Sequence, residues 1–276
     1  MKNSLVISTY NWPEALNICL ESVKKQSVLP TEIIIADDGS DVKTAELISL
    51  HQKNFPVPVL HVWQPDEGFQ LAKIRNKAFA KASTDYLIQI DGDLILHPHF
   101  IKDHLSIAAP GYFITGSRVL LQKKITEEIL QTGDLDELKL FIKNSKNFFN
   151  GLRIKPLRNF MATRYKQTGK HTFYVKGCNM AFWKNDLIKV NGYDESFTGW
   201  GKEDSEIAIR LINAAVKKKF LKMGGIAYHL FHKEVGREKE KLNTQLMQNA
   251  IDKNYTSCKN GLNKYLPSFE IIHAND

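Results

Sequence analysis

Short apolar runs alternate with amphipathic stretches along the first third of the chain. Four runs are short and rich in branched side chains, as strands are, and they cover 4–8, 31–40, 57–64 and 85–93. Between them, apolar residues recur roughly every three or four positions, the spacing of amphipathic helices, at 13–23, 42–54 and 68–83. This alternation predicts an α/β fold, with a mostly parallel sheet flanked by helices on both faces.

The alternation becomes irregular in the second part of the chain. The pattern there predicts a helix at 99–108, a strand at 111–121, mixed helix and loop at 125–170, an ordered block at 178–215 that ends in an amphipathic helix, a short strand at 224–232 and a polar helical tail at 235–266. No internal repeat, low-complexity tract or linker rich in Pro, Gly and Ser interrupts the sequence. We therefore expect a single domain over residues 1–276 with an elaborated C-terminal half.

Polar clusters follow three of the predicted strands: Ser8-Thr9-Tyr10, Asp37-Asp38 and Asp91-Gly92-Asp93. Such sheets bind ligands at the carboxyl ends of their strands, so these clusters are expected to converge on one edge. The two carboxylates around Gly92 suit a hard cation such as Mg²⁺ or Mn²⁺, with phosphates and water as the other ligands. The alternative is a simple turn at the end of the strand.

Two histidines, His229 and His232, follow the short strand near residue 228. At this spacing they are either metal ligands or surface imidazoles. Imidazole nitrogens would shift the preference from Mg²⁺ toward Mn²⁺ or another transition metal. A zinc enzyme is a weaker alternative because the sequence has no His-Glu-x-x-His motif.

A tryptophan between two glycines, Gly199-Trp200-Gly201, precedes Glu203 and Asp204 at the start of the amphipathic helix. An aromatic face beside carboxylates is suited to sugar binding. The alternative is that the acids only interact with the positive end of the helix dipole. Arg75 likewise has two interpretations, because its fork of donors can bind a pyrophosphate or form a surface salt bridge.

The formal net charge of +8 is unevenly distributed. No Asp or Glu occurs from Leu138 to Asn185, whereas Lys and Arg recur throughout this basic segment, 138–184. The segment is either a solvated surface or a contact for an anionic partner such as phosphate, an acidic glycan or an anionic membrane. We expect no nucleic-acid partner, because no recognisable nucleic-acid-binding motif is present.

The cysteines and the apolar runs favour a reducing, cytoplasmic location. Cys19, Cys178 and Cys258 are far apart, which argues against a disulfide framework and a cysteine-rich zinc site. The apolar run near the N-terminus is too short for a secretory signal. No stretch approaches the roughly 20 apolar residues that a membrane helix needs.

Taken in order, these motifs resemble the family 2 glycosyltransferases of GT-A fold. The N-terminal resemblance rests on "VISTYNWPEAL", "IIIADDGS", "GFQLAKIRNKA" and "IQIDGDLIL". The block "GCNMAFWKNDLIKVNGYDESFTGWGKEDSEIAIRL" is similar to the acceptor-side motif of β-1,4-galactosyltransferases and bacterial chondroitin-type polymerases. The resemblance covers roughly 3–120 and 172–235. It implies a Rossmann-like GT-A domain with a nucleotide-sugar-binding half at 1–121, an acceptor-binding and catalytic half at 122–234 and a helical tail at 235–276.

The resemblance also implies roles for individual residues on the donor side. It implies that Ser8, Thr9 and Tyr10 line the nucleotide-sugar pocket and that Asp38 holds the uracil or ribose. Arg75 is implied to lie near the base and phosphates, and Asp91 to contact the ribose or the metal. Asp93 is implied as a direct ligand of Mn²⁺, with Mg²⁺ as the alternative cation. His232 is implied to complete the metal site, and His229 stands where the galactosyltransferases have methionine.

On the acceptor side, the resemblance implies Asp204 as catalytic base, Glu203 as a ligand of the acceptor sugar and Trp200 as its platform. Two departures concern the acceptor. Lys202 stands where a glycine is common in the family, and the basic segment has no counterpart.

The expected activity is that of an inverting, metal-dependent glycosyltransferase. It moves a hexose or N-acetylhexosamine from a UDP-sugar to a hydroxyl of a lipid-linked or protein-linked glycan, as in bacterial surface polysaccharide, lipopolysaccharide or glycoprotein synthesis. The basic segment predicts peripheral contact with an anionic membrane at its inner face. The competing interpretations are a non-catalytic nucleotide-sugar or glycan-binding module, an Asp-x-Asp phosphotransferase and a nucleotidyltransferase.

Overall fold

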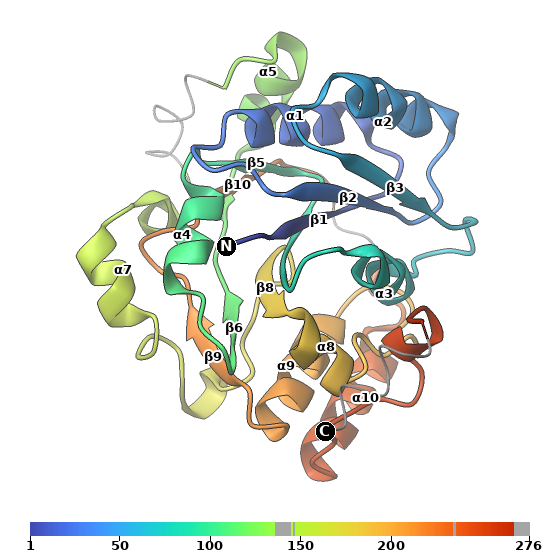
Figure 1. Cartoon of the computed structure of the whole chain (residues 1–276), viewed down its shortest axis with the longest axis vertical. Helices are drawn as coiled ribbons and strands as arrows, with labels where there is room; N and C mark the ends of the chain where they lie inside the picture. Colours follow the sequence, from blue (N-terminus) through green and yellow to red (C-terminus); the bar gives the residue numbers. More distant parts are fainter. Residues whose placement is uncertain (136–144, 146, 234–235, 268–276) are drawn as a thin grey trace.

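The computed structural model describes residues 1–135, 145, 147–233 and 236–267. A central sheet lies between two groups of helices, with α1 and α2 on one side and α3, α8 and α9 on the other (Figure 1). The predicted α/β architecture is therefore confirmed.

Seven strands form the central sheet, in the order β3-β2-β1-β4-β8-β6-β9. Their bounds are β1 Ser4–Thr9, β2 Glu32–Asp37, β3 Val59–Trp63, β4 Tyr86–Asp91, β6 Tyr112–Thr115, β8 Asn179–Trp183 and β9 Lys217–Phe220. Strands β3, β2, β1 and β4 run parallel, β8 is antiparallel to both β4 and β6, and β9 is parallel to β6. The sheet is mostly parallel, as predicted, and the carboxyl ends of β1, β2 and β4 share one edge.

Two of the predicted strands are wrong in extent. The strand predicted at 85–93 ends as β4 at Asp91, and a separate strand, β5, Leu94–Leu96, follows after a turn. The run 111–121 is divided into β6 and β7, Val119–Leu120. The chain leaves the central sheet at Gly116, where a Cβ atom would lie 2.3 Å from Nδ2 of Asn179.

A small second sheet, ordered β5-β10-β7, contains the short strand β10, Ala227–His229. Strand β10 is antiparallel to β5, with His229 opposite Leu94, and parallel to β7, with His229 opposite Leu120. This pairing places the histidine motif beside the turn that contains Asp93, although the two are far apart in sequence.

The helices fall close to the predicted stretches. Their bounds are α1 Pro13–Lys24, α2 Val42–Asn54, α3 Leu71–Lys81, α4 Phe100–Ile107, α5 Lys123–Thr132, α7 Lys155–Met161, α8 Lys184–Lys189, α9 Glu203–Asn213 and α10 Glu240–Asp252, with 3₁₀ turns η2 Phe148–Gly151, η3 Gly169–His171 and η4 Leu262–Lys264. The tail predicted as helical over 235–266 contains only α10 and η4 within its described part, because the chain turns at Asn254, which has a φ of 49°. No helix in the described parts of the chain is long and apolar enough to cross a membrane.

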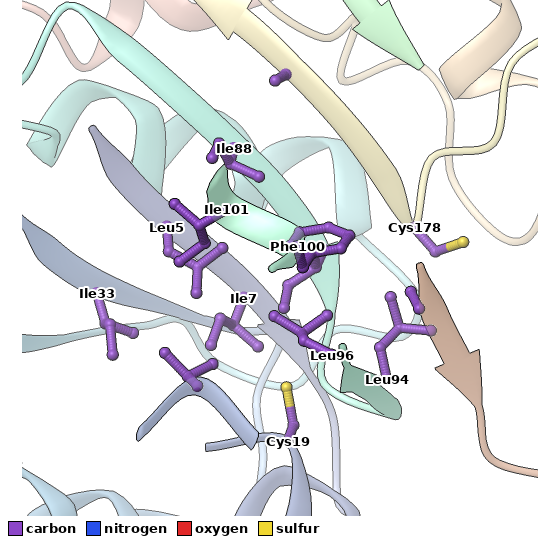
Figure 2. Close-up of a cluster of buried hydrophobic side chains, with 14 of the residues drawn as sticks. Leu5, Ile7, Cys19, Ile33, Ile88, Leu94, Leu96, Phe100, Ile101 and Cys178 are labelled. Atoms are coloured by element: carbon purple, nitrogen blue, oxygen red, sulfur yellow. The ribbon is translucent and has the colours of Figure 1, made fainter. Parts of the chain in front are cut away.

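The inner strands β1, β2, β4 and β8 of the central sheet are buried on both faces, as expected of strands covered by helices. Leu5 and Ile7 of β1 pack on the face covered by α1, whereas Val6 belongs to the core on the opposite face. Figure 2 shows the first of these cores, in which Phe100 of α4 and Cys19 of α1 lie close to the strands. Rigid packing on both faces fixes the strand ends that carry the polar clusters.

Part of the basic segment is turned inward. Asp103 of α4 is fully buried and accepts hydrogen bonds from the guanidinium groups of Arg153 (2.8 Å) and Arg158. The backbone N–H of Gly225 also donates to it, at 3.1 Å. Of the two interpretations of the basic segment, neither a solvated surface nor a contact for an external anion applies to these two arginines, because both are paired with Asp103. Lys139, Lys143 and Lys146 lie outside the described residues.

Candidate active site

Arg75 connects the strand ends to the first turn of α9. Its guanidinium is 1% exposed and donates to Ser8 Oγ at 3.2 Å, to Asp91 Oδ1 at 2.9 Å and to Asp204 Oδ1 at 2.9 Å. Ser8 and Asp91 are directly opposite each other in the pairing of β1 with β4. We call Ser8, Arg75, Asp91, Tyr193 and Asp204 the Arg75 network.

Because Arg75 is completely buried, its charge must be compensated by protein groups, unlike that of a surface arginine. A buried charge must be paired, because its desolvation is otherwise uncompensated. Burial also raises the pKa of Asp91 to about 6, although the charge of Arg75 opposes that shift. Because all three guanidinium nitrogens already meet protein oxygens, Arg75 positions the two carboxylates. It is not a surface salt bridge.

Asp204 lies in the first turn of α9 and is held on two sides. Its Oδ1 accepts from Arg75 and from the Tyr193 hydroxyl, at 3.0 Å. On the other side, a Cβ atom on Gly177 would lie 1.8 Å from Oδ2, so only glycine leaves room for this carboxylate. Oδ2 has no hydrogen bond within the described chain. One oxygen is thus fixed and the other is available to a substrate hydroxyl.

Glu203, the neighbour of Asp204, is buried in an uncharged form. Its side chain is 7% exposed, and Oε2 has no hydrogen-bond partner among the described residues. Burial, together with the nearby charge of Asp204, raises the pKa of Glu203 to about 8. A protonated carboxyl donates one hydrogen bond and accepts others, which suits the hydroxyl groups of a sugar.

The turn after β4 and the end of β10 bring Asp93, His229 and His232 together. Asp93 Oδ2 lies 3.2 Å from His229 Nε2 and 3.1 Å from His232 Nε2. Ligand atoms of all three residues lie within 4.8 Å of one another. We call these residues the metal group.

The hydrogen bonds around the metal group indicate a cation site. His229 Nδ1 is 2.8 Å from the carbonyl oxygen of Leu230, and His232 Nδ1 is 2.8 Å from that of Lys233. A carbonyl only accepts, so both Nδ1 atoms carry the proton. A neutral imidazole here directs its Nε2 lone pair toward a cation held beside Asp93, whereas a protonated His232 donates its Nε2–H to the Asp93 carboxylate. The second Asp93 oxygen is also buried without a partner among the described residues. A buried carboxylate oxygen beside two imidazole nitrogens suits a cation, and the nitrogen ligands favour Mn²⁺ over Mg²⁺.

The ionisation of the metal group agrees with metal binding. Burial lowers the pKa of His229 to about 4, which keeps this imidazole neutral and able to bind a metal. The hydrogen bond with Asp93 raises the pKa of His232. Burial alone would raise the pKa of Asp93, but His232 and His229 outweigh it and lower that pKa.

The remaining donor-side residues lie around the ends of β1 and β2. Asp38 is buried and accepts hydrogen bonds from Gln64 Nε2 at 2.6 Å and from the backbone N–H of Gln70 at 2.8 Å. Its own backbone N–H donates to the carbonyl of Thr9. Tyr10 is half exposed, and its hydroxyl donates to Asp66 at 2.9 Å. These residues form a polar cluster at the ends of β1 and β2, beside Ser8 of the Arg75 network.

The Gly-Trp-Gly turn precedes the carboxylates but is partly covered. The Trp200 side chain is 37% exposed, and the guanidinium carbon of Arg237 lies 4.8 Å from its ring centroid. Lys202, just before α9, has a φ of 77°. This left-handed backbone explains why glycine suits the position, and it is strained for lysine.

Several residues beside the site were not found from the sequence: Gln89, Arg118, Tyr193, Lys176 and Gly177. The Tyr193 hydroxyl lies 3.0 Å from Gln89 Oε1 and 3.0 Å from Asp204, and the side-chain amide of Gln89 donates to the carbonyl of Gly177. Arg118 Nη1 is 3.5 Å from the Cys178 sulfur. Gly177 and Tyr193 lie inside the acceptor-side motif, which was the available signal, whereas the hydrogen bonds depend on the tertiary structure.

Two family models match the chain. Residues 4–190 match glycosyl transferase family 2, and residues 157–233 match the family described as the N-terminal domain of galactosyltransferase. The two matches together span the Arg75 network and the metal group.

Curated relatives include synthases of polysaccharides. The chain is 27% identical over 270 residues to a chondroitin synthase of Escherichia coli, covering 90% of this chain and 38% of the relative. It is 26% identical over 229 residues to a validoxylamine A glucosyltransferase of Streptomyces hygroscopicus subsp. limoneus, covering 75% of this chain and 47% of the relative. The chain thus spans less than half the length of each of these two relatives.

Solved structures share the fold at low sequence identity. TarS of S. aureus superposes with a TM-score of 0.62 at 15% identity, covering 91% of this chain and 40% of TarS. The mannosyltransferase PcManGT of Pyrobaculum calidifontis, in complex with GDP-Man and Mn²⁺, superposes with a TM-score of 0.61 at 15% identity, covering 99% of this chain and 68% of that one. These similarities confirm the GT-A fold that the sequence predicted.

Proposed function

The chain belongs to glycosyl transferase family 2 and is a glycosyltransferase, and on this premise we propose that it is an inverting, metal-dependent enzyme that uses a UDP-sugar. The proposed donor carries a hexose or N-acetylhexosamine, and the proposed acceptor is a hydroxyl of a lipid-linked or protein-linked glycan. One observation carries this proposal. Arg75 binds both Asp91, on the donor side, and Asp204, whose second oxygen has no hydrogen bond within the described chain.

Asp204 is the proposed catalytic base. Arg75 and Tyr193 hold its Oδ1, so Oδ2 is the oxygen that removes the proton of the acceptor hydroxyl. A general base must lie within hydrogen-bond reach of that proton. The hydroxyl oxygen then attacks the anomeric carbon as the bond to the nucleotide breaks. Glu203, held protonated by burial, hydrogen-bonds the acceptor sugar, and Trp200 provides the platform on which that sugar lies.

Asp93, His229 and His232 are the proposed ligands of Mn²⁺, with Mg²⁺ as the alternative. When bound there, a divalent cation supplies positive charge to the diphosphate that leaves. Arg118 adds a permanent charge on the same side, because it lies one residue before β7, the strand that pairs with β10. Ser8, Thr9, Tyr10, Asp38 and Asp91 are the proposed contacts of the nucleotide.

This assignment divides the proposed single domain by function. Residues 1–121 bind the nucleotide-sugar, 122–234 bind the acceptor and complete the catalytic site, and 235–276 form a tail. The shared central sheet supports treating the two halves as one domain, since β8 and β9 pair within the same sheet as β1 to β4.

We also propose a cytoplasmic protein with peripheral contact to the inner face of an anionic membrane. Phe149, Ile154 and Phe160 are exposed large apolar side chains close in sequence to the exposed cations Lys155 and Arg164. This mixture suits the interface of an anionic bilayer. Vesicle flotation tests this membrane contact. The protein is expected to bind vesicles that contain phosphatidylglycerol and not vesicles of pure phosphatidylcholine. Failure to bind either kind of vesicle would contradict the proposed contact.

A donor screen with Mn²⁺ tests the transferase proposal. Each UDP-sugar and GDP-sugar is incubated with the protein, and release of the nucleoside diphosphate is measured with and without glycan acceptors. Release is expected from one class of UDP-sugar and is expected to be lost with Asp93→Ala. Release from GDP-sugars alone would contradict the proposed donor, and equal release by Asp93→Ala would contradict the metal site.

The anomeric configuration of the product tests the single displacement. An α-linked UDP-sugar is expected to give a β-linked product, measured by the anomeric proton coupling in nuclear magnetic resonance spectra. An α-linked product would contradict the proposed role of Asp204.

A further inference from the structure

Three cations surround one tyrosine on the acceptor side of the site. The ammonium nitrogens of Lys166 and Lys176 lie 3.9 Å and 5.4 Å from the ring centroid of Tyr174. Arg118 lies beside them, with Nη1 3.5 Å from the sulfur of Cys178. We call Arg118, Lys166, Tyr174 and Lys176 the Tyr174 cluster.

The cations of the Tyr174 cluster have no acidic partner among the described residues. The two ammonium groups form neither a hydrogen bond nor an ion pair within the described chain, and the only such contact of the Arg118 guanidinium is with the Cys178 sulfur. All three side chains are partly buried. Burial and the neighbouring positive charges lower the pKa of Lys166 and of Lys176. Holding like charges together in this way is unfavourable unless an anion joins them.

Other partly buried cations nearby are paired with oxygen atoms. Arg153 and Arg158 bind the carboxylate of Asp103. Lys218 Nζ donates to the backbone carbonyls of His171 and Thr172, both at 2.7 Å. The fold therefore satisfies other cations of this region but leaves those around Tyr174 without oxygen partners.

The Tyr174 cluster lies next to the proposed catalytic base. Lys176 directly precedes Gly177, the glycine whose backbone abuts the Asp204 carboxylate. The backbone N–H of Lys176 donates to Thr115 Oγ1 at 3.1 Å, which fixes this position against β6. The charge of Asp204 acts to raise the pKa of Lys176, whereas the charges of Asp91 and Asp93 act to raise the pKa of Arg118. The two lysines are thus on the acceptor side, and Arg118 lies between them and the donor side.

The backbone at Lys166 has an uncommon conformation. Its φ is 53°, in the left-handed region that a lysine seldom adopts. This conformation, in the turn after α7, accompanies the placement of the ammonium over the Tyr174 ring.

We propose that the Tyr174 cluster binds acidic groups of the acceptor, so that the acceptor is a glycan whose sugars carry carboxylate or phosphate groups. This inference rests on the proposed transferase function and adds the chemical class of its acceptor. Lys176 contacts the acidic group nearest the reacting hydroxyl, and Lys166 contacts a group farther along the glycan. Arg118 adds a third positive charge to the field that selects an acidic glycan.

Matched oligosaccharides test the charge requirement by titration calorimetry at low salt. Tetragalacturonic acid is compared with its methyl ester, and a phosphorylated dextran fragment with the same fragment unmodified. The protein is expected to bind at least one charged member about tenfold more tightly than its neutral partner, the effect of one charged hydrogen bond. The pair that shows the preference identifies carboxylate or phosphate. Equal binding of charged and neutral members in both pairs would overturn the proposal.

Variants locate the effect. Lys176→Met is expected to reduce the preference for the charged probe about tenfold, Lys166→Met is expected to reduce it less, and Lys176→Arg is expected to keep it. Because the Lys176 ammonium has no hydrogen bond within the described chain, these changes should leave the folded state intact, which thermal unfolding checks. The matched control is Lys102→Met, which removes an exposed lysine of α4. An equal loss in Lys102→Met would overturn the proposal.

The same variants separate the acceptor from the donor. UDP affinity is expected to be unchanged in Lys176→Met and Lys166→Met. A loss of UDP affinity with unchanged oligosaccharide binding would overturn the proposal by assigning the cations to the diphosphate. If no nucleotide-sugar supports transfer but the preference for charged oligosaccharides persists and is lost in Lys176→Met, the transferase proposal fails while the acidic glycan site stands.

Discussion

The Arg75 network and the metal group lie at neighbouring strand ends, yet their hydrogen bonding differs. In the Arg75 network, each guanidinium nitrogen meets an oxygen of Ser8, Asp91 or Asp204. In the metal group, one Asp93 oxygen faces the Nε2 atoms of two imidazoles, and the second oxygen is buried without a partner among the described residues. The Arg75 network is held by its own hydrogen bonds, whereas the metal group contains a buried oxygen that a cation would satisfy.

This difference indicates what each set does. A satisfied buried network fixes the orientation of its members, because every alternative arrangement loses a hydrogen bond. A buried oxygen without a partner is instead stabilised by what binds there. We therefore expect substitutions in the metal group to abolish ligand binding, and substitutions in the Arg75 network to alter positioning and stability.

The largest effect is expected from Asp93→Ala. Loss of this ligand removes the cation that offsets the charge of the leaving diphosphate, so transfer should fall at least about a thousandfold. Initial rates with the donor identified in the screen measure it. The matched control is Asp252→Ala, an exposed aspartate at the end of α10, which should keep full activity. Activity of Asp93→Ala within a few fold of the control would contradict the metal group.

The next effect is expected from Asp204→Asn, which keeps the shape of the carboxylate but removes its basicity. The rate constant kcat should fall about a hundredfold or more, as for loss of a general base. Donor affinity should not change, since the metal group is intact. Steady-state kinetics measures kcat, and UDP binding measures donor affinity. Loss of UDP binding in this variant would mean that the two regions are not separable.

Arg75→Lys is expected to affect both catalysis and donor binding. A lysine cannot donate to Ser8, Asp91 and Asp204 in the geometry of the guanidinium fork. Both kcat and donor affinity should therefore fall, each about tenfold, whereas Asp204→Asn changes kcat alone. Arg75→Met should in addition destabilise the fold by about 1–3 kcal/mol, because it leaves the partly buried carboxylates of Asp91 and Asp204 without their cation. A change in donor affinity alone would support a nucleotide-contact role and contradict the positioning role.

The smallest effect is expected from Glu203→Gln and concerns stability. The pKa of Glu203 is raised from 4.5 to about 8 in the folded state, so folding takes up a proton between these values. Stability from this group is present below pH 4.5 and is lost as the pH rises to about 8. The melting temperature of the wild type should therefore fall by a few degrees more than that of Glu203→Gln between pH 5 and pH 9. Parallel curves for the two proteins would contradict the raised pKa.

The sequence was sufficient for the fold and for the positions of the main carboxylates. Parallel strands buried on both faces give continuous apolar runs, so the strand ends at Ser8, Asp38 and Asp91 could be located from the pattern. The division of the run 111–121 between two sheets was missed, because it depends on the contact of Gly116 with Asn179, which is distant in sequence.

The grouping of the candidate site residues could be expected from the sequence, but their hydrogen bonds could not. His229 and His232 could be matched to Asp93 only through the resemblance, and the pairing of β10 with β5 supplies the physical reason. The burial of Arg75 could not be predicted, because it depends on packing between α3 and the start of α9. The pairing of Arg153 and Arg158 with Asp103 could not be predicted, since nothing local marks Asp103 as their partner.

Binding of Mn²⁺ in the presence of UDP tests most directly whether the metal group, and not the Arg75 network, holds the cation. Titration calorimetry is performed on the wild type, Asp93→Ala and Asp204→Asn. The wild type and Asp204→Asn are expected to bind a single Mn²⁺ with similar affinity, and Asp93→Ala is expected to show no binding at this site. Equal Mn²⁺ affinity in Asp93→Ala and the wild type would contradict the assignment of the metal group.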